Sequence, residues 1–459
     1  MQVVNNGMRY AKPINSLTAV KQIKDLKELK KLRSVLFKSG RYVDLEQHKE
    51  PAFSAPLCSV PIRECVHVPL YDPLGENMYP VPRKGDRCAR FSPLARTKTS
   101  RNELGPSWVM SPVSGYVEDI TTIDHPILGR VFCAVIRPDN SVPPLPTVQH
   151  SLSTMTIDGV LRTIHQAGIV DEFDGEALIS KILRARERDV REIAAIAIDD
   201  SPYISSALKT VSEFAGEVTD GITVVLKALD GGSAKLAIYD CDEVQLRPDA
   251  DRLGFVTPVK MSGGFPLISK FKRQYYPKGN FLPIGVQALR AAANALLRGI
   301  PQTNGIVTIG GDCIKHPCNA VIVNGTPLED VLRFAGVNKV PNYVIFGDTM
   351  NGMTVTDMQT PVPVGTRAIT VMHSLTRPEK TSCTRCGKCV TVCPMGLPVY
   401  LAMRYYDRGD KDGAAAFGAE KCSGCGACSA VCPAGLETAD IMYSLKQRRR
   451  EALKNAGGK

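Results

Sequence analysis

The stretch CTRCGKCVTVCP at residues 383–394 recurs as CSGCGACSAVCP at residues 422–433. Both have the pattern C-x2-C-x2-C-x3-C-P, and the second copy follows the first by 39 residues. The match continues past the cysteines, because Gly396 and Leu397 correspond to Gly435 and Leu436. The chain thus contains an internal duplication, which holds eight of its 15 cysteines.

This spacing is typical of four-iron, four-sulfur clusters. Two residues between successive cysteines let three thiolates of one tight loop point inward, and the fourth comes from the other repeat, as in two-cluster ferredoxins. Gly387 and Gly426 relieve crowding where the backbone passes close to inorganic sulfide. We therefore predict two [4Fe-4S] clusters, one held by Cys383, Cys386, Cys389 and Cys432 and the other by Cys422, Cys425, Cys428 and Cys393.

Zinc is the main alternative for clustered cysteines. Zinc ribbons use two C-x2-C pairs, which give four ligands in all. Two complete runs of four cysteines do not suit tetrahedral zinc, so the spacing favours iron–sulfur clusters. Ligation by thiolates also indicates a reduced, oxygen-poor setting.

The composition is that of an ordinary globular protein. A chain of 459 residues can form two to four domains, and 44% hydrophobic and 22% charged residues are close to average. No apolar run reaches the roughly 18 residues that cross a bilayer, and Met1 to Leu17 lacks the pattern of a secretory signal. We expect a cytoplasmic protein without a transmembrane segment, and peripheral association with the inner face of the membrane stays open.

The formal net charge of +11 is moderately basic. Such a surface can steer an acidic protein partner or a phosphate-bearing cofactor, although a merely well-solvated surface explains it equally well. No basic-aromatic pattern predicts binding to nucleic acid. We therefore expect redox proteins, as donor and acceptor, to be the partners.

The part of the chain before the cysteines divides into four segments. Residues 1–66 form an N-terminal extension, with a basic amphipathic helix from Ser16 to about Gly40 that more often packs on its own protein than on a membrane. Residues 67–150 are rich in Pro, Gly and short β-type runs and predict a structural β module. Two further segments follow, at residues 151–302 and 303–372.

Residues 151–302 alternate helices and strands, which predicts a doubly wound α/β sheet. The expected helices are 155–167 and 177–188, the expected strands are 193–198 and 234–239, and residues 206–214 and 223–229 continue the alternation. Residues 303–372 return to short strands with one helix at 327–334, as in a small β-grasp domain. Residues 373–440 form the cluster module, and residues 441–459 form a basic tail.

This order of parts resembles the C subunit of Rnf electron-transport complexes and its relatives, which include microcompartment cobalamin reductases and proline-reductase-associated electron-transfer proteins. The resemblance covers about residues 67–440. It implies a barrel-sandwich hybrid, a flavoprotein-like α/β domain as in complex I, a soluble-ligand-binding β-grasp domain and a two-cluster ferredoxin-like module. The matching stretches are KGD (84–86), SPVSG (111–115), AGIV (167–170), YPKG (276–279), GGDCIKHP (310–317) and NGTP (324–327).

The chain departs from this family at the flavin loop. After AGIV the family has a glycine-rich loop of the form GLGGAGFPT, whose amides hold the flavin phosphate. Here Asp171 to Lys181 reads DEFDGEALISK, with one glycine and four acids, which repel phosphate. The resemblance therefore implies FMN, but this loop is degenerate, which puts FMN and direct NADH oxidation in doubt. A GFP string with a following lysine, at 264–270, lies in the wrong place in the chain order.

We predict that the chain passes electrons through two clusters, from an NADH/flavin or ferredoxin-type donor to a partner reductase or membrane complex. Two alternatives stay open, a scaffold or docking protein with structural clusters and a complete NADH dehydrogenase. No catalytic residue is assigned. Outside the repeats, Cys313 and Cys318 form a candidate redox pair, although small buried thiols are more common.

Overall fold

The computed structural model describes residues 42–73, 78–98, 104–244, 246, 254–375 and 377–457. The chain forms two compact units, of which unit 1 comprises residues 1–43 and 377–459 and unit 2 comprises residues 44–376. The amphipathic helix expected within residues 16–40 lies outside the described residues. Among those described, no helix combines the length and apolar content that crossing a membrane requires.

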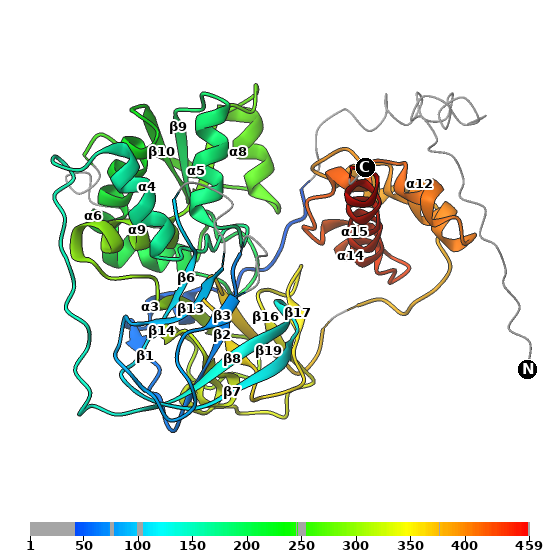
Figure 1. The fold of residues 1–459 in the computed structure, drawn as a ribbon. Coiled ribbons are helices and arrows are strands. Elements are labelled where there is room, and N and C mark those ends of the chain that lie inside the picture. The colour runs from blue at the N-terminus through cyan, green and yellow to red at the C-terminus, as the bar shows by residue number, and fades with distance from the viewer. Residues whose placement is uncertain are drawn as a thin grey trace, which may run out of the picture. The chain divides into compact units, whose positions relative to one another are not determined.

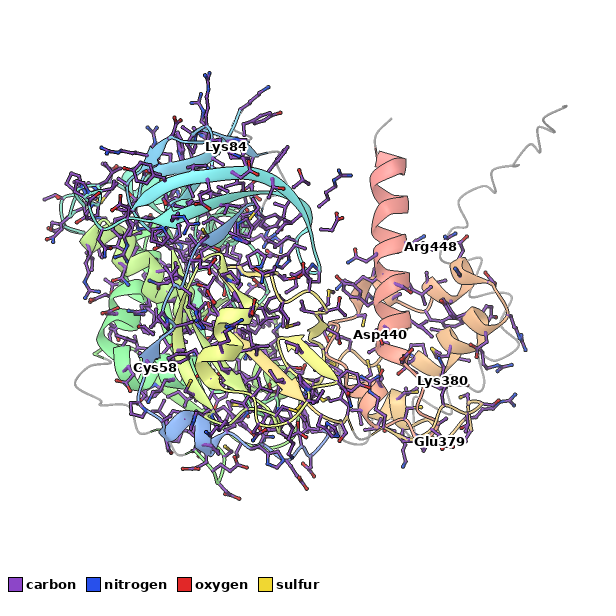
Figure 2. The ribbon with its side chains drawn as sticks, turned by 90° about the horizontal axis from the view of Figure 1, so that it is seen from below. Cys58, Lys84, Glu379, Lys380, Asp440 and Arg448 are labelled. Atoms are coloured by element: carbon purple, nitrogen blue, oxygen red, sulfur yellow. The ribbon has the colours of Figure 1, made fainter. Side chains whose placement is uncertain are left out.

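The first part of unit 2 is built from two antiparallel sheets, β2-β8-β7-β4 and β3-β5-β6. Side chains such as Val68, Leu94 and Ile136 have no exposed surface and fill the core between the sheets. Lys84 lies at the surface of this layer (Figure 2). The strands are β2 (Val66–Leu70), β3 (Met78–Pro80), β4 (Arg87–Cys88), β5 (Pro93–Thr97), β6 (Trp108–Met110), β7 (Gly115–His125) and β8 (Gly129–Pro138).

The second part of unit 2 is a parallel sheet in the order β11-β10-β9-β12. Helices α5 and α8 lie on one side of β9 and β10, and α6 and α9 lie on the other (Figure 1). Because both faces are covered, β9 is apolar throughout its buried length. The elements are α4 (Ile157–Gln166), α5 (Leu178–Glu187), β9 (Glu192–Ala197), α6 (Ser206–Ala228), β10 (Ser233–Tyr239), β11 (Thr257–Met261), α8 (Leu267–Tyr275), β12 (Leu282–Gly285) and α9 (Val286–Arg298).

Helices α4 and α5 and strands β9 and β10 confirm the elements expected from the sequence to within two residues at each end. Residues 206–214 and 223–229, which were expected as separate elements of the alternation, instead form one helix, α6. A kink at Phe214, with φ −130° and ψ 32°, marks where the first was expected to end. Helix α6 packs against α9, a contact between separate segments that the sequence alone does not show.

The third part of unit 2 is a mixed sheet in the order β1-β14-β13-β19-β16-β17, with α10 packed on it. Strand β1 comes from the N-terminal segment and pairs in parallel with β14, so residues 44–66 are integral to unit 2 and not a separate extension. The elements are α3 (Glu50–Ser54), β1 (Cys58–Ser59), β13 (Asn304–Gly310), β14 (Cys318–Val323), α10 (Leu328–Ala335), β16 (Tyr343–Phe346), β17 (Met353–Thr354) and β19 (Ala368–Met372). A short pair, β15 (Thr326–Pro327) and β18 (Pro361–Val362), completes unit 2.

In its described residues unit 1 is helical, and each run of cysteines leads into a single-turn helix followed by a longer helix. Val399, Met403, Met442 and Leu445 are buried in its core. Because Met442 and Leu445 belong to the last helix, the boundary expected at residue 440 falls inside a packed element. The elements are α11 (Lys388–Thr391), α12 (Val399–Asp407), α13 (Lys411–Ala415), the 3-10 turn η1 (Ala419–Lys421), α14 (Ala427–Ala430) and α15 (Thr438–Gly457).

Candidate functional site

The eight cysteines of the duplication gather around two small cavities in unit 1. Each cavity takes three thiols from one repeat and one from the other, so neither repeat completes a set alone. One is lined by Cys383, Cys386, Cys389 and Cys432, and the other by Cys393, Cys422, Cys425 and Cys428.

Each cysteine loop is shaped by a glycine. Gly387 and Gly426 have φ +76° and +79°, a left-handed conformation that glycine adopts without steric cost. Each precedes a single-turn helix, α11 or α14, whose second residue is the third cysteine of the loop. The turn thereby brings Cys389 and Cys428 back toward the two cysteines that precede them.

The walls of the cavities suit an iron–sulfur cluster. Met403 and Leu436 line the first cavity, and Leu397 and Met442 line the second, so the remaining surface is largely apolar. Backbone amides also point at sulfur, because the Leu397 N–H donates to Cys393 Sγ over 3.4 Å. Hydrogen bonds of this kind, together with exposure, set the potential of such a cluster.

In the part of the chain that the structure describes, no group of three or more His, Cys, Asp or Glu side chains is arranged to hold a single metal ion, and this includes the two cysteine sets. The choice between iron–sulfur clusters and zinc therefore rests on the cysteine spacing.

The expected flavin loop lies at the carboxyl ends of the parallel strands, near the switch point between β9 and β12 where such sheets bind ligands. The Lys181 Nζ donates to Asp171 over 2.5 Å and to Asp174 over 2.7 Å. Lys181 is 3% exposed and Asp171 has no exposed surface. The loop's cation is therefore neutralised by the loop's own acids.

Glu172 occupies the N-terminus of α9. Its carboxylate accepts hydrogen bonds from the Gln287 and Ala288 amides over 2.7 and 2.9 Å. A helix N-terminus of this kind is an anion-binding position, and here a carboxyl group of the chain itself accepts its hydrogen bonds. Burial, and then the neighbouring Asp171, raise the pKa of Glu172, while the two amide bonds act in the opposite direction.

Lys49, in the N-terminal segment, also lies at the carboxyl ends of the parallel strands. Its side chain is wholly buried, and its Nζ donates to the carbonyl oxygens of Ser201 and Ile204. Burial lowers the pKa of Lys49 to about 8. Burial also raises the pKa of Asp200, next to Ser201, to about 6, and Asp200 accepts a hydrogen bond from the Leu267 amide over 2.5 Å.

These contacts do not fit a flavin phosphate. The anion position at α9 holds Glu172, the cation at Lys181 is paired, and a buried lysine lies beside Asp200. The sequence revealed the acids of the loop but not their partners. In the sequence, Lys49 is only a lysine next to a short apolar segment. That pattern is too common to indicate a buried lysine.

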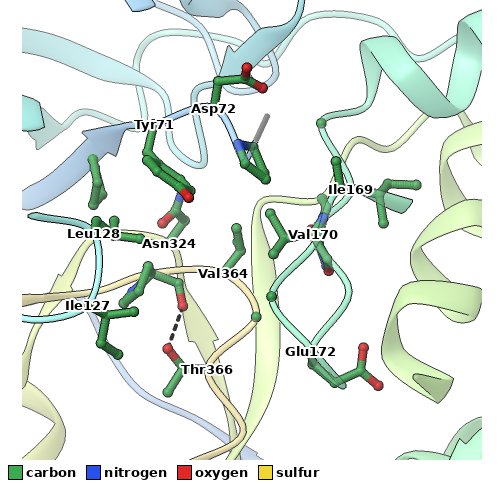
Figure 3. Close-up of a pocket in the computed structure, with 18 of the residues that line it drawn as sticks. Tyr71, Asp72, Ile127, Leu128, Ile169, Val170, Glu172, Asn324, Val364 and Thr366 are labelled. Atoms are coloured by element: carbon green, nitrogen blue, oxygen red, sulfur yellow. Dashed lines mark hydrogen bonds between the residues drawn. The ribbon is translucent and has the colours of Figure 1, made fainter. Parts of the chain in front are cut away.

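A cavity of about 340 Å³ lies within unit 2 beside the expected flavin loop, and Val170 and Glu172 are among the residues that line it (Figure 3). Apolar side chains such as Ile127 and Leu128 line it, and Asn324 Oδ1, which is buried, has no hydrogen-bond partner there. Its walls come from residues far apart in the chain, and they include the AGIV stretch (167–170), part of the expected flavin loop and Asn324 of the NGTP stretch. Its size suits a small molecule.

The candidate redox pair consists of buried thiols. Cys313 has no exposed surface and Cys318 is 7% exposed. Burial raises the pKa of Cys313 to about 11 and that of Cys318 to about 12, and Cys58, not Cys313, is the thiol that interacts with Cys318. Both thiols are therefore protonated at neutral pH, which disfavours thiolate chemistry.

Comparison with known proteins identifies two domains. Residues 36–141 match the family described as the RnfC barrel sandwich hybrid domain, and residues 376–433 match the 4Fe-4S dicluster domain. The first match begins at residue 36, well before the boundary expected at 67. The second spans all eight cysteines of the duplication.

The chain is also similar over most of its length to curated proteins. It is 25% identical over 383 residues to the C subunit of the proton-translocating ferredoxin:NAD(+) oxidoreductase complex of Clostridium ljungdahlii, an alignment that covers 79% of this chain and 82% of that protein. It is 28% identical over 399 residues to the C subunit of the ion-translocating oxidoreductase complex of Vibrio cholerae, covering 78% of this chain. The chain spans only 50% of that Vibrio protein.

Among solved structures, a chain of an NAD+-reducing [NiFe]-hydrogenase in the H2-reduced state is similar, with 13% identity, a TM-score of 0.40 and coverage of 69% of both chains. A likeness of this size supports no conclusion about function.

Proposed function

We propose that this chain is an electron-transfer subunit of a ferredoxin- and NAD-linked oxidoreductase complex at a membrane. The basis is that the chain is an RnfC-like protein with a 4Fe-4S dicluster domain. The observation that carries this proposal is the pair of cavities, each lined by four cysteines. A [4Fe-4S] cluster supplies one-electron redox chemistry. This role requires no bond-making chemistry from the side chains of the protein.

The residues around each cavity have separate tasks. In our assignment Cys383, Cys386 and Cys389, with Cys432 from the second repeat, hold one cluster, and the remaining four cysteines hold the other. Apolar side chains cover part of each cavity, and the backbone amide that points at Cys393 stabilises the negative charge of its sulfur. Because each repeat supplies a ligand to both sets, the two clusters lie close together, which favours rapid transfer between them.

The donor and the acceptor are, in this proposal, other proteins. The crevice of the parallel sheet supports this view, because Glu172 and Lys181 already fill the positions in which a flavin phosphate would be held. No step of the proposed function passes through FMN. We also assign the parallel sheet to the doubly wound flavoprotein type and the mixed sheet with α10 to the β-grasp type, on the strength of their strand orders.

Anaerobic redox cycling tests the proposal. Protein isolated without oxygen should contain about eight irons per chain, lose visible absorbance with dithionite, and recover it when an oxidised viologen is added. Failure to cycle in protein that carries the iron would support a scaffold with structural clusters. Bleaching by NADH alone would support a complete NADH dehydrogenase and contradict the proposal as stated.

A further inference from the structure

The two cysteine loops differ in charge at positions that correspond in the duplication. Arg385 stands where the second repeat has Gly424, and Lys388 stands where it has Ala427. Residues 377–389 contain four basic residues and one acidic residue, whereas residues 416–428 contain one of each. Glu379 and Lys380 belong to this first stretch and lie together on the surface of unit 1 (Figure 2). The first loop is therefore the basic one.

The backbone at Arg385 is one that glycine adopts more easily. Arg385 has φ +57° and Gly424 has φ +73°, so both residues are left-handed. A residue with a side chain pays about 1–2 kcal/mol in this conformation relative to its ordinary one, and glycine does not. The first loop thus carries a long cationic side chain at a position where glycine would be less strained, as the second loop demonstrates.

The first loop is also the more exposed of the two. Cys383, Cys386 and Arg385 are exposed, whereas Cys428 and Ala427 in the second loop are buried. Helix α15 covers the second loop, because the Lys446 Nζ donates to the Cys422 carbonyl over 2.5 Å. Transfer of an electron to another protein requires a short distance to that protein's cofactor. A cluster in the first cavity is therefore better placed to exchange electrons with a partner.

We propose that the first cysteine loop, residues 383–389, is a docking surface for an acidic protein electron carrier, which Arg385 and Lys388 attract and orient. This inference rests on the proposed electron-transfer function and adds the place of contact and the charge of the partner. Complementary charge raises association rates and fixes orientation, and its effect weakens as salt screens it. Lys380 and Arg377 contribute less to this surface, because both lie 3.8 Å from the Glu437 carboxylate.

The test uses a variant that copies the second loop. The double variant Arg385→Gly, Lys388→Ala should fold, because the same residues already stand at these positions of the second repeat. The matched control is Arg408→Ala, Lys411→Ala, which removes the same charge from two exposed positions that line neither cavity. Iron content and reduction by dithionite are measured first for all three proteins.

Binding is then measured with both proteins oxidised, so that no electron is transferred, and an oxidised acidic two-cluster ferredoxin serves as the probe at several salt concentrations. We expect the loop variant to bind about tenfold more weakly than the wild type at low salt, with a shallower salt dependence, and the control to stay within about twofold. Cytochrome c, a basic carrier, should not bind preferentially to the wild type.

Two results would overturn the docking surface: equal affinity of the loop variant and the wild type, or absence of salt-dependent ferredoxin binding by the wild type. With iron content and dithionite reduction intact, either result refutes the docking surface alone. Wild-type protein without reducible clusters would instead refute the proposed function.

Discussion

The carboxylate of Glu172 fills the space in which a β-carbon on Gly285 would lie, so the end of β12 and the loop before α5 fit together only because residue 285 is glycine. The same carboxylate holds the first amides of α9. The fit joins two segments that are more than a hundred residues apart, at the edge of the sheet where a ligand would otherwise bind.

Gly285→Ala should therefore destabilise unit 2 by about 1–3 kcal/mol, because the added methyl group displaces a buried carboxylate. Urea unfolding, monitored by far-UV circular dichroism, measures this decrease in the free energy of unfolding. In a Glu172→Ala background the same substitution should cost clearly less, since the overlap is gone. Equal costs in both backgrounds would show that the two residues are not coupled.

Asp200 should make unit 2 less stable as the pH rises from about 4 to about 6. Burial raises the pKa of its carboxyl from 3.8 to about 6, so in this window the folded protein retains a proton that the unfolded chain releases, and stability falls with rising pH. Asp200→Asn removes this titration. Its free energy of unfolding relative to the wild type should therefore increase between pH 4 and about pH 6, by at most about 3 kcal/mol. Urea midpoints at pH 4, 5, 6 and 7 measure the difference.

The exposed Asp220 provides the control for this titration. Asp220→Asn should follow the wild-type pH profile. Parallel profiles for Asp200→Asn and the wild type would contradict the raised pKa.

Lys49→Met should destabilise unit 2 by about 3 kcal/mol, because it leaves the Ser201 and Ile204 carbonyls without a donor and removes a buried cation that interacts with Asp200. Methionine has similar length, so lost packing contributes little. Lys84→Met is the control, since the Lys84 side chain is 74% exposed, and it should change stability by less than about 0.5 kcal/mol. A similar loss in both variants would argue against a structural role for Lys49.

Iron content should reveal which cysteines share a cluster. Cys432→Ser should leave about four irons per chain, and Cys432→Ser with Cys389→Ser should leave the same number, because both residues line one cavity. Cys432→Ser with Cys393→Ser should remove nearly all iron. Cys58→Ser, outside the duplication, should keep about eight. If the Cys432/Cys389 pair removed nearly all the iron, as the Cys432/Cys393 pair does under either arrangement, each repeat would instead hold its own cluster.

Protein that carries both clusters should contain far less than one FMN per chain. The reason is that Glu172 and the paired Lys181 occupy the positions that would bind the phosphate. Acid denaturation followed by flavin fluorescence measures the content, with a known flavoprotein as the positive control. One FMN released per chain would refute this reading of the crevice.

The sequence predicted the parts of this protein whose signals are local. The cysteine spacing and the 39-residue repeat predict the cluster module because the ligands of each loop lie within seven residues. Helices α4 and α5 show a clear apolar periodicity, and β9 is a short apolar run, so their limits were predictable. The covering of both faces of the sheet then follows from the alternation of helices and strands.

Contacts between distant segments were not predictable. Glu172 meets α9 across 115 residues, and Lys49 meets Ser201 across 152. A single sequence shows a carboxylate or a lysine but not the amides or carbonyls that it contacts after folding. The continuity of α6 across Phe214 was likewise not predictable, because α6 packs on α9, which lies further along the chain.

The sharing of cysteines between the repeats also governs how the module can be made. Synthesis must pass Cys432 before the first cavity has its fourth sulfur, although the other three are available much earlier. Cofactor insertion is thus a late event that has to follow the pairing of both halves. A chain interrupted between them would offer an assembly factor three of the four thiols of the first set and one of the four thiols of the second.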